Sequence, residues 1–460
     1  MVVLPIAAVA GFFWPGVPMY DTVSQYGQVL SNEVDDWHPP IMVRLWQLLE
    51  PLGSGTAPMF ALQIGFYALG FALIIAALVR SARPWSALAV GLLAVSPLLL
   101  GWQMVVLKDG QMLGALLVAA GIVAHYRLSG RRVPAVALTA VAILLIYATA
   151  VRANAVFATV PFVMILAPGP KSMLVRAPIA ALAMLVVLAV SPAINHQILK
   201  AEPSGVAKSQ PMFDLAAIAV ATPSPSPFTA PERDKIVARH CVKNFFWDPI
   251  ADLSACGPVT ARLNSESEMK LYETLARSVV AHPIAYGRHR LRHWNSTERW
   301  LVPPNLPDAA PPDEGEPNDE GLKMPEGAVP SAWQEAAATE ATTPFGWPII
   351  WTVAGLVLLP AAWRRRSDGS GGLALALLAS SLTLEASFLV VSIASDLRYH
   401  LWAMTASALA LILLCRDLSR RDRIVGSAAL LLVAAAGIAA RVSLPPAPDS
   451  YEAMLHAVSG

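Results

Sequence analysis

The chain has 460 residues, of which 55% are hydrophobic and only 14% are charged, and its mean hydropathy is +0.53. Because soluble domains carry about 25% charged residues, this composition predicts a polytopic membrane protein. The formal net charge of +1 argues against a nucleic-acid partner, since nucleic acid binds to a concentrated basic surface.

Apolar runs predict an all-α membrane protein with about 11 transmembrane helices, each crossing roughly 30 Å of hydrocarbon, although the first and sixth are short. The runs lie at 1–15, 57–79, 85–106, 110–126, 134–151, 155–168, 177–194, 345–363, 372–394, 400–415 and 425–440. They divide the chain into an N-terminal transmembrane module (1–194), a loop domain (195–344) and a C-terminal transmembrane module (345–460).

Positive residues gather in the short loops on one side of these spans. They are Arg80, Arg83, Arg127, Arg131, Arg132, Lys171, Arg176, Arg364, Arg365, Arg366, Arg416, Arg420, Arg421 and Arg423. Short loops rich in Lys and Arg stay in the cytoplasm. The first loop (16–56), the loop domain and the carboxyl terminus are therefore expected to face outward.

The loop domain is predicted to contain helices at 230–243 and 265–280, preceded by a patch rich in Pro, Ser and Thr at 222–231. Cys241 and Cys256 both fall in this domain, so they form either a disulfide, in an oxidising compartment, or two buried free thiols. The segment 303–330 is acidic and rich in proline with almost no aromatic residues, which predicts a disordered or loosely draped loop.

The first outward loop concentrates carboxylates, aromatic rings and an imidazole at the membrane surface. Among them are Asp21, Asp35, Asp36, Trp37 and His38. Two prolines follow His38, and because proline fixes its own φ and disfavours helix in the residue before it, they should hold His38 rigidly beside the acidic pair. The loop is either a built site or a solvated loop with an aromatic interfacial belt.

Other outward ends also carry charges, which are costly at such depth unless they are paired or functional. Lys108 and Asp109 are adjacent and form either an interfacial ion pair or part of a site. Arg152 with Asn154 is either a helix cap or a binding group. Arg398 and Tyr399, in the sequence Asp396 to His400, form either a polar turn or a phosphate clamp, since a guanidinium binds phosphate well.

Basic residues recur just before the acidic segment, where Arg288 and Arg292 share one face of a predicted helix. Such a segment either lies on anionic headgroups or contacts a substrate.

These motifs resemble the polytopic glycosyltransferases of the C-type fold, such as the lipid A aminoarabinose transferases and the protein O-mannosyltransferases. The resemblance rests on an Asp near the start of the first outward loop, Asp-Trp-His-Pro-Pro at its end (36–40), Lys-Asp at the next outward turn (108–109) and Arg-Tyr-His before a late helix (398–400). It implies an enzyme, in a bacterial inner membrane, that transfers a sugar from a polyprenyl-phosphate carrier to a lipid, glycan or protein acceptor on the outward face.

Transfer of a sugar from a lipid phosphate needs a base for the acceptor and cations for the leaving phosphate. We expect Asp21 to be the base, with inversion at the anomeric carbon, and Asp36 and His38 to orient it or the acceptor. The phosphate is expected beside Lys108, Arg152, Arg398 and Tyr399, with further substrate contacts at Asp35, Trp37, Asp109, Asn154, Arg288 and Arg292.

The chain departs from the family by having one carboxylate, Asp21, at the start of the loop where the family has an acidic pair. The sequence identifies no certain cofactor, and binding of a divalent metal ion stays open. Two other classes also remain: a transporter or flippase of lipid-linked glycans, which would depend on Glu385 in the bilayer, and a surface-polysaccharide polymerase or ligase.

Overall fold

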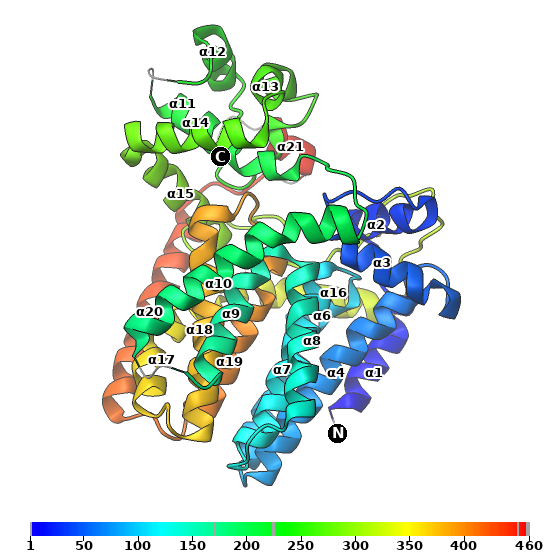
Figure 1. Cartoon of the computed structure of the whole chain (residues 1–460), viewed down its shortest axis with the longest axis vertical. Coiled ribbons are helices and arrows are strands. Elements are labelled where there is room, and N and C mark those ends of the chain that lie inside the picture. The colour runs from blue at the N-terminus through cyan, green and yellow to red at the C-terminus, as the bar shows by residue number, and fades with distance from the viewer. Residues whose placement is uncertain (1, 170–171, 223–225, 449, 457–460) are drawn as a thin grey trace.

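The computed structural model describes residues 2–169, 172–222, 226–448 and 450–456. Within these ranges the chain is helical and its β-structure is limited to isolated bridges. Three predictions fall on residues outside the described ranges: the cytoplasmic position of Lys171, part of the patch at 222–231, and the outward position of the last four residues. Figure 1 shows a bundle of long helices beneath a group of shorter ones.

The helices of the bundle coincide with the apolar runs of the sequence. They are α1 (Val3–Phe12), α4 (Ala57–Arg80), α5 (Pro84–Ala94), α6 (Pro97–Met104), α7 (Lys108–Arg127), α8 (Ala135–Val151), α9 (Val156–Leu166), α10 (Met173–Ala193), α17 (Pro348–Arg364), α18 (Gly369–Val391), α19 (Leu401–Leu414) and α20 (Arg420–Ser443). Among the described residues, five helices are long and apolar enough to cross a membrane, and α5 with α6, bent by 49°, makes a sixth. The prediction of an all-α membrane protein is confirmed, while the count of about 11 spans stays a prediction.

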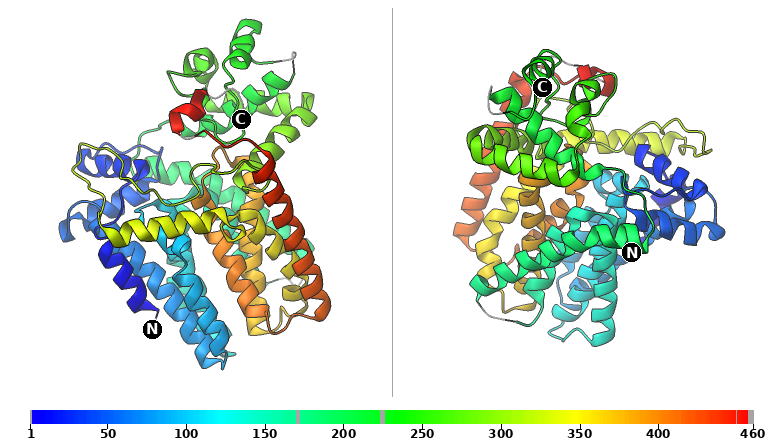
Figure 2. Two further views of the ribbon diagram at one scale, coloured as in Figure 1. Left: turned by 180° about the vertical axis from the view of Figure 1, so that it is seen from behind. Right: turned by 45° about the horizontal axis from the view of Figure 1, so that its top comes forward.

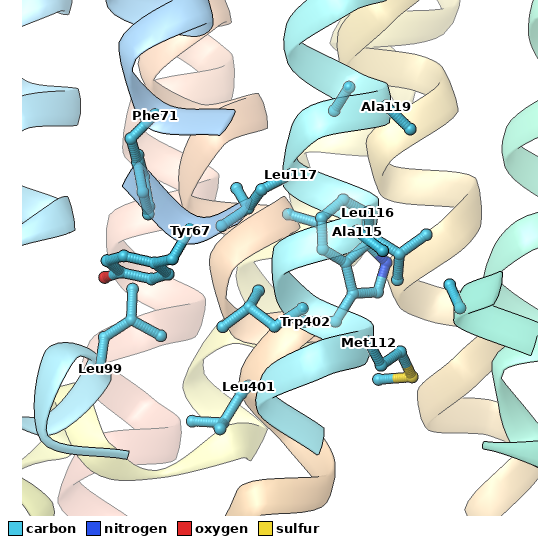
Figure 3. Close-up of a cluster of buried hydrophobic side chains, with 14 of the residues drawn as sticks. Tyr67, Phe71, Leu99, Met112, Ala115, Leu116, Leu117, Ala119, Leu401 and Trp402 are labelled. Atoms are coloured by element: carbon cyan, nitrogen blue, oxygen red, sulfur yellow. The ribbon is translucent and has the colours of Figure 1, made fainter. Parts of the chain in front are cut away.

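The bundle core is closely packed around α4 and α7. An added Cβ on Gly70 of α4 would lie 2.5 Å from Leu117 Cβ, and one on Gly114 of α7 would lie 2.8 Å from Phe66 Cβ. Small residues therefore let these two helices approach each other, as in other membrane bundles. Figure 3 shows Tyr67 and Leu117 from this pair in the same cluster as Trp402 of α19.

The loop domain lies above the bundle in Figure 1 and consists of α11 (Ser209–Ala221), α12 (Ala230–Ala238), α13 (Gly257–Asn264), α14 (Glu268–Ala281) and α15 (Pro283–Thr297). The predicted helices at 230–243 and 265–280 correspond to α12 and α14. A disulfide joins Cys241 to Cys256, the first of the two alternatives for these cysteines.

The acidic segment runs without α-helix from Glu298 to Gly327, then continues into α16 (Ala328–Thr342), which lies across the bundle in the left view of Figure 2. Its backbone contacts the first loop, because Glu316 N donates to Pro18 O at 3.2 Å. Trp102 Nε1 donates to Ala309 O at 3.3 Å. The segment is thus draped over the end of the bundle that bears the loop domain.

The short connections between α4 and α5, α7 and α8, α17 and α18, and α19 and α20 all lie at the other end of the bundle (Figure 1). Except for Arg176 in α10, the arginines that were predicted to be cytoplasmic lie at or beside these connections. The first loop and the loop domain therefore share one end of the bundle, called the loop-domain end below.

Candidate active site

The first loop is positioned by backbone pairing with the segment between α6 and α7. Val17 N donates to Met104 O at 2.8 Å, and Val106 N donates to Val17 O at 3.2 Å. Thr22 Oγ1, in the first turn of α2 (Tyr20–Ser31), donates to Val106 O at 2.8 Å. These bonds place the start of α2, which carries Asp21, beside the start of α7, which carries Lys108.

Asp21 lies at the centre of the site and is only 6% exposed. Its Oδ2 is 2.7 Å from Lys108 Nζ and 3.2 Å from Nη1 of Arg398, which comes from the 3₁₀ turn Leu397–His400 before α19. Burial acts to raise the pKa of Asp21, but Arg398 and then Lys108 outweigh it and hold the pKa well below its usual range. The carboxylate is therefore ionised and a weak base in this state.

His38 completes the contacts around Lys108. Its Nδ1 lies 3.1 Å from Lys108 Nζ, and its side chain is buried. Burial and the neighbouring ammonium lower the pKa of His38 to about 4, so the ring is neutral at pH 7. Because Nδ1 faces a cation and accepts, the ring proton is on Nε2, which has no hydrogen-bond partner among the described residues.

Arg398 is also bonded to Asp396, whose Oδ2 lies 3.0 Å from its Nε and 2.9 Å from its Nη2. The ring of Tyr399 lies between two guanidiniums, with the Cζ of Arg152 at 4.0 Å and that of Arg398 at 5.5 Å from its centroid. Arg152 in turn pairs with Asp109, a carboxylate at the start of α7. Its Nε donates to Asn154 Oδ1 at 2.9 Å.

These contacts join six charged side chains, called the charge network: Asp21, Lys108, Asp109, Arg152, Asp396 and Arg398. Three carboxylates balance three cations, so the network is neutral as a whole. An anion that enters it must therefore replace a carboxylate as the partner of a cation, or a carboxylate must take up a proton.

The network brings together seven of the predicted residues with Asp396: Asp21, Lys108, Asp109, Arg152, Asn154, Arg398 and Tyr399, and His38 touches it through Lys108. Asp36 lies apart from it. Its Oδ1 accepts from the backbone N–H and the hydroxyl of Ser204, both at 2.7 Å, and its Oδ2 is 3.4 Å from His196 Nε2. Asp36 therefore fastens the first loop to the chain that follows α10.

Asp35 and Trp37 also make other contacts. Asp35 Oδ1 accepts from Gln28 Nε2 at 3.1 Å and from Trp37 N at 2.9 Å, and the Trp37 ring lies 6.2 Å from that of Trp247 in the loop domain. Arg288 and Arg292 line a separate groove beside α15. None of these four residues belongs to the network.

Sequence reasoning missed Gln25. It lies four residues after Asp21 in α2, is fully buried, and both atoms of its amide lack a hydrogen-bond partner among the described residues. Residues four apart share a helix face, so this spacing was the available signal. A buried, unpaired amide next to a charged site is a candidate for binding a hydroxyl-rich ligand.

Asp308 was also missed, because it lies in the acidic segment. Its backbone oxygen accepts from Leu397 N at 2.9 Å, which places it beside the Arg398 turn. Burial and then Asp396 raise the pKa of Asp308 to about 6. Asp308 is therefore a second carboxylate near the network, and at neutral pH it is a stronger base than Asp21.

A cavity of about 830 Å³ adjoins the network and is lined by Met19, Trp102, Asp308 and one side of α16. Met19 Sδ lies 3.6 Å from Arg398 Nη1, so the cavity reaches the edge of the charged groups. Its volume lies in the range of pockets that hold a small-molecule ligand.

Glu385 lies deeper in the bundle, is 2% exposed, and its Oε2 is 2.7 Å from His400 Nδ1. Among the described residues, no group of three or more His, Cys, Asp or Glu side chains is arranged to hold a metal ion, and the carboxylates of the network are engaged with cations.

Neither a protein-family model nor a curated relative matches the sequence. The structure is similar to that of the archaeal oligosaccharyltransferase AglB from Archaeoglobus fulgidus, solved in complex with an inhibitory peptide and a dolichol-phosphate, at 14% identity and a TM-score of 0.37. The match covers 95% of this chain and 54% of that one, so this chain spans about half its length. At this TM-score the match carries no argument about the fold or the activity of this chain.

Proposed function

We propose that this protein is a membrane glycosyltransferase that moves a sugar from a polyprenyl-phosphate carrier to an acceptor hydroxyl or amine on the outward face of the membrane. The observation that carries the proposal is the placement of Asp21 against both Lys108 and Arg398, at 2.7 and 3.2 Å. A buried carboxylate and two cations from three distant segments supply the base and the phosphate partners that such a transfer needs.

Donor binding would change the state of the base. The donor phosphate carries a negative charge, and in a neutral network it has to replace Asp21 as the partner of Lys108 and Arg398. Once these cations turn to the phosphate, burial dominates at Asp21 and its pKa rises. Asp21 then takes a proton readily, so the donor itself converts a weak base into an effective one.

In the transfer, the acceptor oxygen or nitrogen attacks the anomeric carbon while the bond from that carbon to the phosphate oxygen breaks. The acceptor proton passes to Asp21, and the bonding electrons stay on the carrier phosphate, which Lys108 and Arg398 stabilise. A direct attack from the face opposite the phosphate inverts the anomeric carbon. The unpaired Nε2 of His38 and the amide of Gln25 are placed to bind hydroxyls of the sugar or acceptor.

Arg152 supports this arrangement from the side. Its guanidinium covers the Tyr399 ring at 4.0 Å and is held by Asp109 and Asn154. The ring fixes the direction of the Arg398 turn, and the cation adds to the positive potential around the phosphate. We propose the cavity lined by Met19 and Asp308 as the entry for the acceptor.

The three-part organisation belongs to the proposal as well: two transmembrane modules, 1–194 and 345–460, hold the site between them, and the loop domain 195–344 covers it. We place the protein in a bacterial inner membrane with the loop-domain end outward, because the arginine-rich short loops lie at the opposite end.

The test starts from cells lacking the gene. Mass spectrometry of their lipids should reveal a sugar-linked carrier that accumulates, and the purified protein should release the carrier phosphate from that lipid when an acceptor extract is added. A flippase would move the lipid between leaflets without releasing phosphate, and would lose function at Glu385. Translocation without phosphate release would therefore overturn the proposal.

A further inference from the structure

A second groove, of about 1050 Å³, lies beside α15 and away from the charge network. One wall is the face of α15 that carries Ile284, Arg288, Leu291 and Arg292. The opposite face of the same helix is buried and holds the loop domain to the bundle. The other wall of the groove is formed by 300–303 and by 444–448, which follows α20.

The groove is basic at its upper part. Arg288 and Arg292 stand one helical turn apart and are exposed, and neither has a carboxylate within 4 Å among the described residues. The described lining residues include no Asp or Glu, so these two arginines give the groove a positive charge.

The groove is apolar elsewhere and extends toward the bilayer. Leu291 is 60% exposed, although large apolar side chains on a water-facing helix are usually covered. Trp300 Nε1 donates to Val433 O at 3.1 Å, ten positions before the end of α20 at Ser443. At 1.5 Å per residue, this contact lies about 15 Å along α20 from its outer end.

The groove has cations at one end and apolar side chains at the depth of the lipid at the other. This arrangement matches an amphiphile with an anionic head group. We propose that the groove binds an anionic phospholipid of the surrounding bilayer, with its phosphate at Arg288 and Arg292 and an acyl chain along Leu291 and Trp300. The carrier lipid is a poorer fit, because none of the six charged residues of the network lines this groove. The inference is independent of the proposed function.

The experiment uses the full-length protein, purified and stripped of lipid in neutral detergent. Phosphatidylglycerol and, separately, a short prenyl phosphate are titrated in while the thermal unfolding midpoint is recorded. Phosphatidylcholine of the same chains and glycerol 3-phosphate are the probes that lack the net charge or the chains. The variant is Arg288→Gln/Arg292→Gln. The matched control is Lys270→Gln/Arg277→Gln in α14, which removes two exposed cations from ion pairs in the same domain.

We expect phosphatidylglycerol to raise the midpoint of the wild type and of the control variant at saturating concentrations, and to do so far more than either probe. The half-saturating concentration should rise at least about tenfold in the double variant, whose midpoint without lipid should equal that of the wild type. If the double variant does not fold, the single variant Arg292→Gln carries the test, with the same shift in direction.

Three results would overturn the inference: equal stabilisation by phosphatidylcholine or glycerol 3-phosphate, an unchanged response of the arginine variants, and a response only to a prenyl phosphate. The last result would indicate that the groove binds the carrier lipid.

Discussion

Asp21→Asn separates the two roles that the charge network combines. Asparagine keeps the shape of the side chain, and its amide oxygen still accepts a hydrogen bond from Lys108, but it has no negative charge and takes no proton at neutral pH. The network changes from neutral to a net charge of +1. Turnover should therefore fall while the affinity for a phosphate rises.

The two magnitudes follow from the contacts of Asp21. Loss of a general base costs roughly 10²-fold to 10⁴-fold in turnover. A carboxylate that a phosphate has displaced from Lys108 and Arg398 would lie about 5 Å from that phosphate, and at an effective dielectric constant of about 20 their repulsion is roughly 3 kcal/mol. Relief of that repulsion should tighten prenyl phosphate binding by about tenfold to a hundredfold, after allowance for water in the site.

The assay measures release of carrier phosphate for turnover and inhibition by a short prenyl phosphate for affinity. Asp214→Asn is the matched control, because Asp214 is also buried and pairs with Arg290 at 2.7 Å, in the loop domain. Both changes break a buried ion pair and should lower the unfolding midpoint similarly. Only Asp21→Asn should shift the two kinetic measurements in opposite directions.

Near-normal turnover of Asp21→Asn would refute the assignment of the base. If Asp308→Asn then abolished turnover, the base would be Asp308, whose pKa of about 6 suits proton uptake at neutral pH. Weaker binding of prenyl phosphate to Asp21→Asn would contradict the argument from charge balance, whatever happened to turnover.

Four further outcomes are expected. Arg398→Lys keeps the charge but loses the guanidinium, which holds Asp396 by two nitrogens. Carrier affinity should therefore fall about tenfold or more. Unchanged inhibition by prenyl phosphate would remove Arg398 from the site. Gln25→Leu removes a buried amide without partners among the described residues, so the unfolding midpoint should rise while turnover falls; a rise in both would make Gln25 a packing residue. The pKa of His38 is lowered from 6.5 to about 4, so its contribution to stability is present above pH 6.5 and is lost as the pH falls toward 4, by about 2 kcal/mol at pH 5. In His38→Asn the unfolding midpoint should therefore change less between pH 7 and pH 5 than in the wild type. An equally steep dependence of the midpoint on pH would count against a buried neutral imidazole. Cys415 is exposed and follows α19 at the arginine-rich end of the bundle. An impermeant thiol reagent should label Glu320→Cys in intact cells, and should label Cys415 only after permeabilisation. The reverse labelling pattern would invert the topology.

Composition and apolar runs predicted the helices of the bundle, because the bilayer imposes length and hydropathy on each span separately. The position of α10, whose described residues are all at least partly exposed, and the bend between α5 and α6 depend on packing between helices. No local pattern encodes them. The number of spans is harder to predict from the sequence, because short helices such as α1 and α9 fit the apolar pattern but are too short to cross a membrane by themselves.

Part of the charge network was singled out from the sequence. Lys108 and Arg398 were chosen because charges at the outward ends of spans are costly, and this argument needs no knowledge of partners. Asp21 was chosen as the first carboxylate after the first span, and Tyr399 as the neighbour of Arg398. Asp36 was grouped with His38 because they are close in the chain, yet the structure turns Asp36 toward Ser204. Asp308 lies near the network only because of the tertiary fold. Gln25 could have been identified by its spacing of four residues from Asp21.

Lys108 and Asp109 show where a stronger inference from the sequence was available. They are adjacent at the start of a helix, and adjacent helical residues do not face each other. They therefore cannot pair with one another, and each buried charge needs a partner from a different element. In the structure, Lys108 pairs with Asp21 of α2, and Asp109 pairs with Arg152 after α8. The dipeptide thus links two remote segments, and with Arg398 these ion pairs form the neutral network that we propose a phosphate opens.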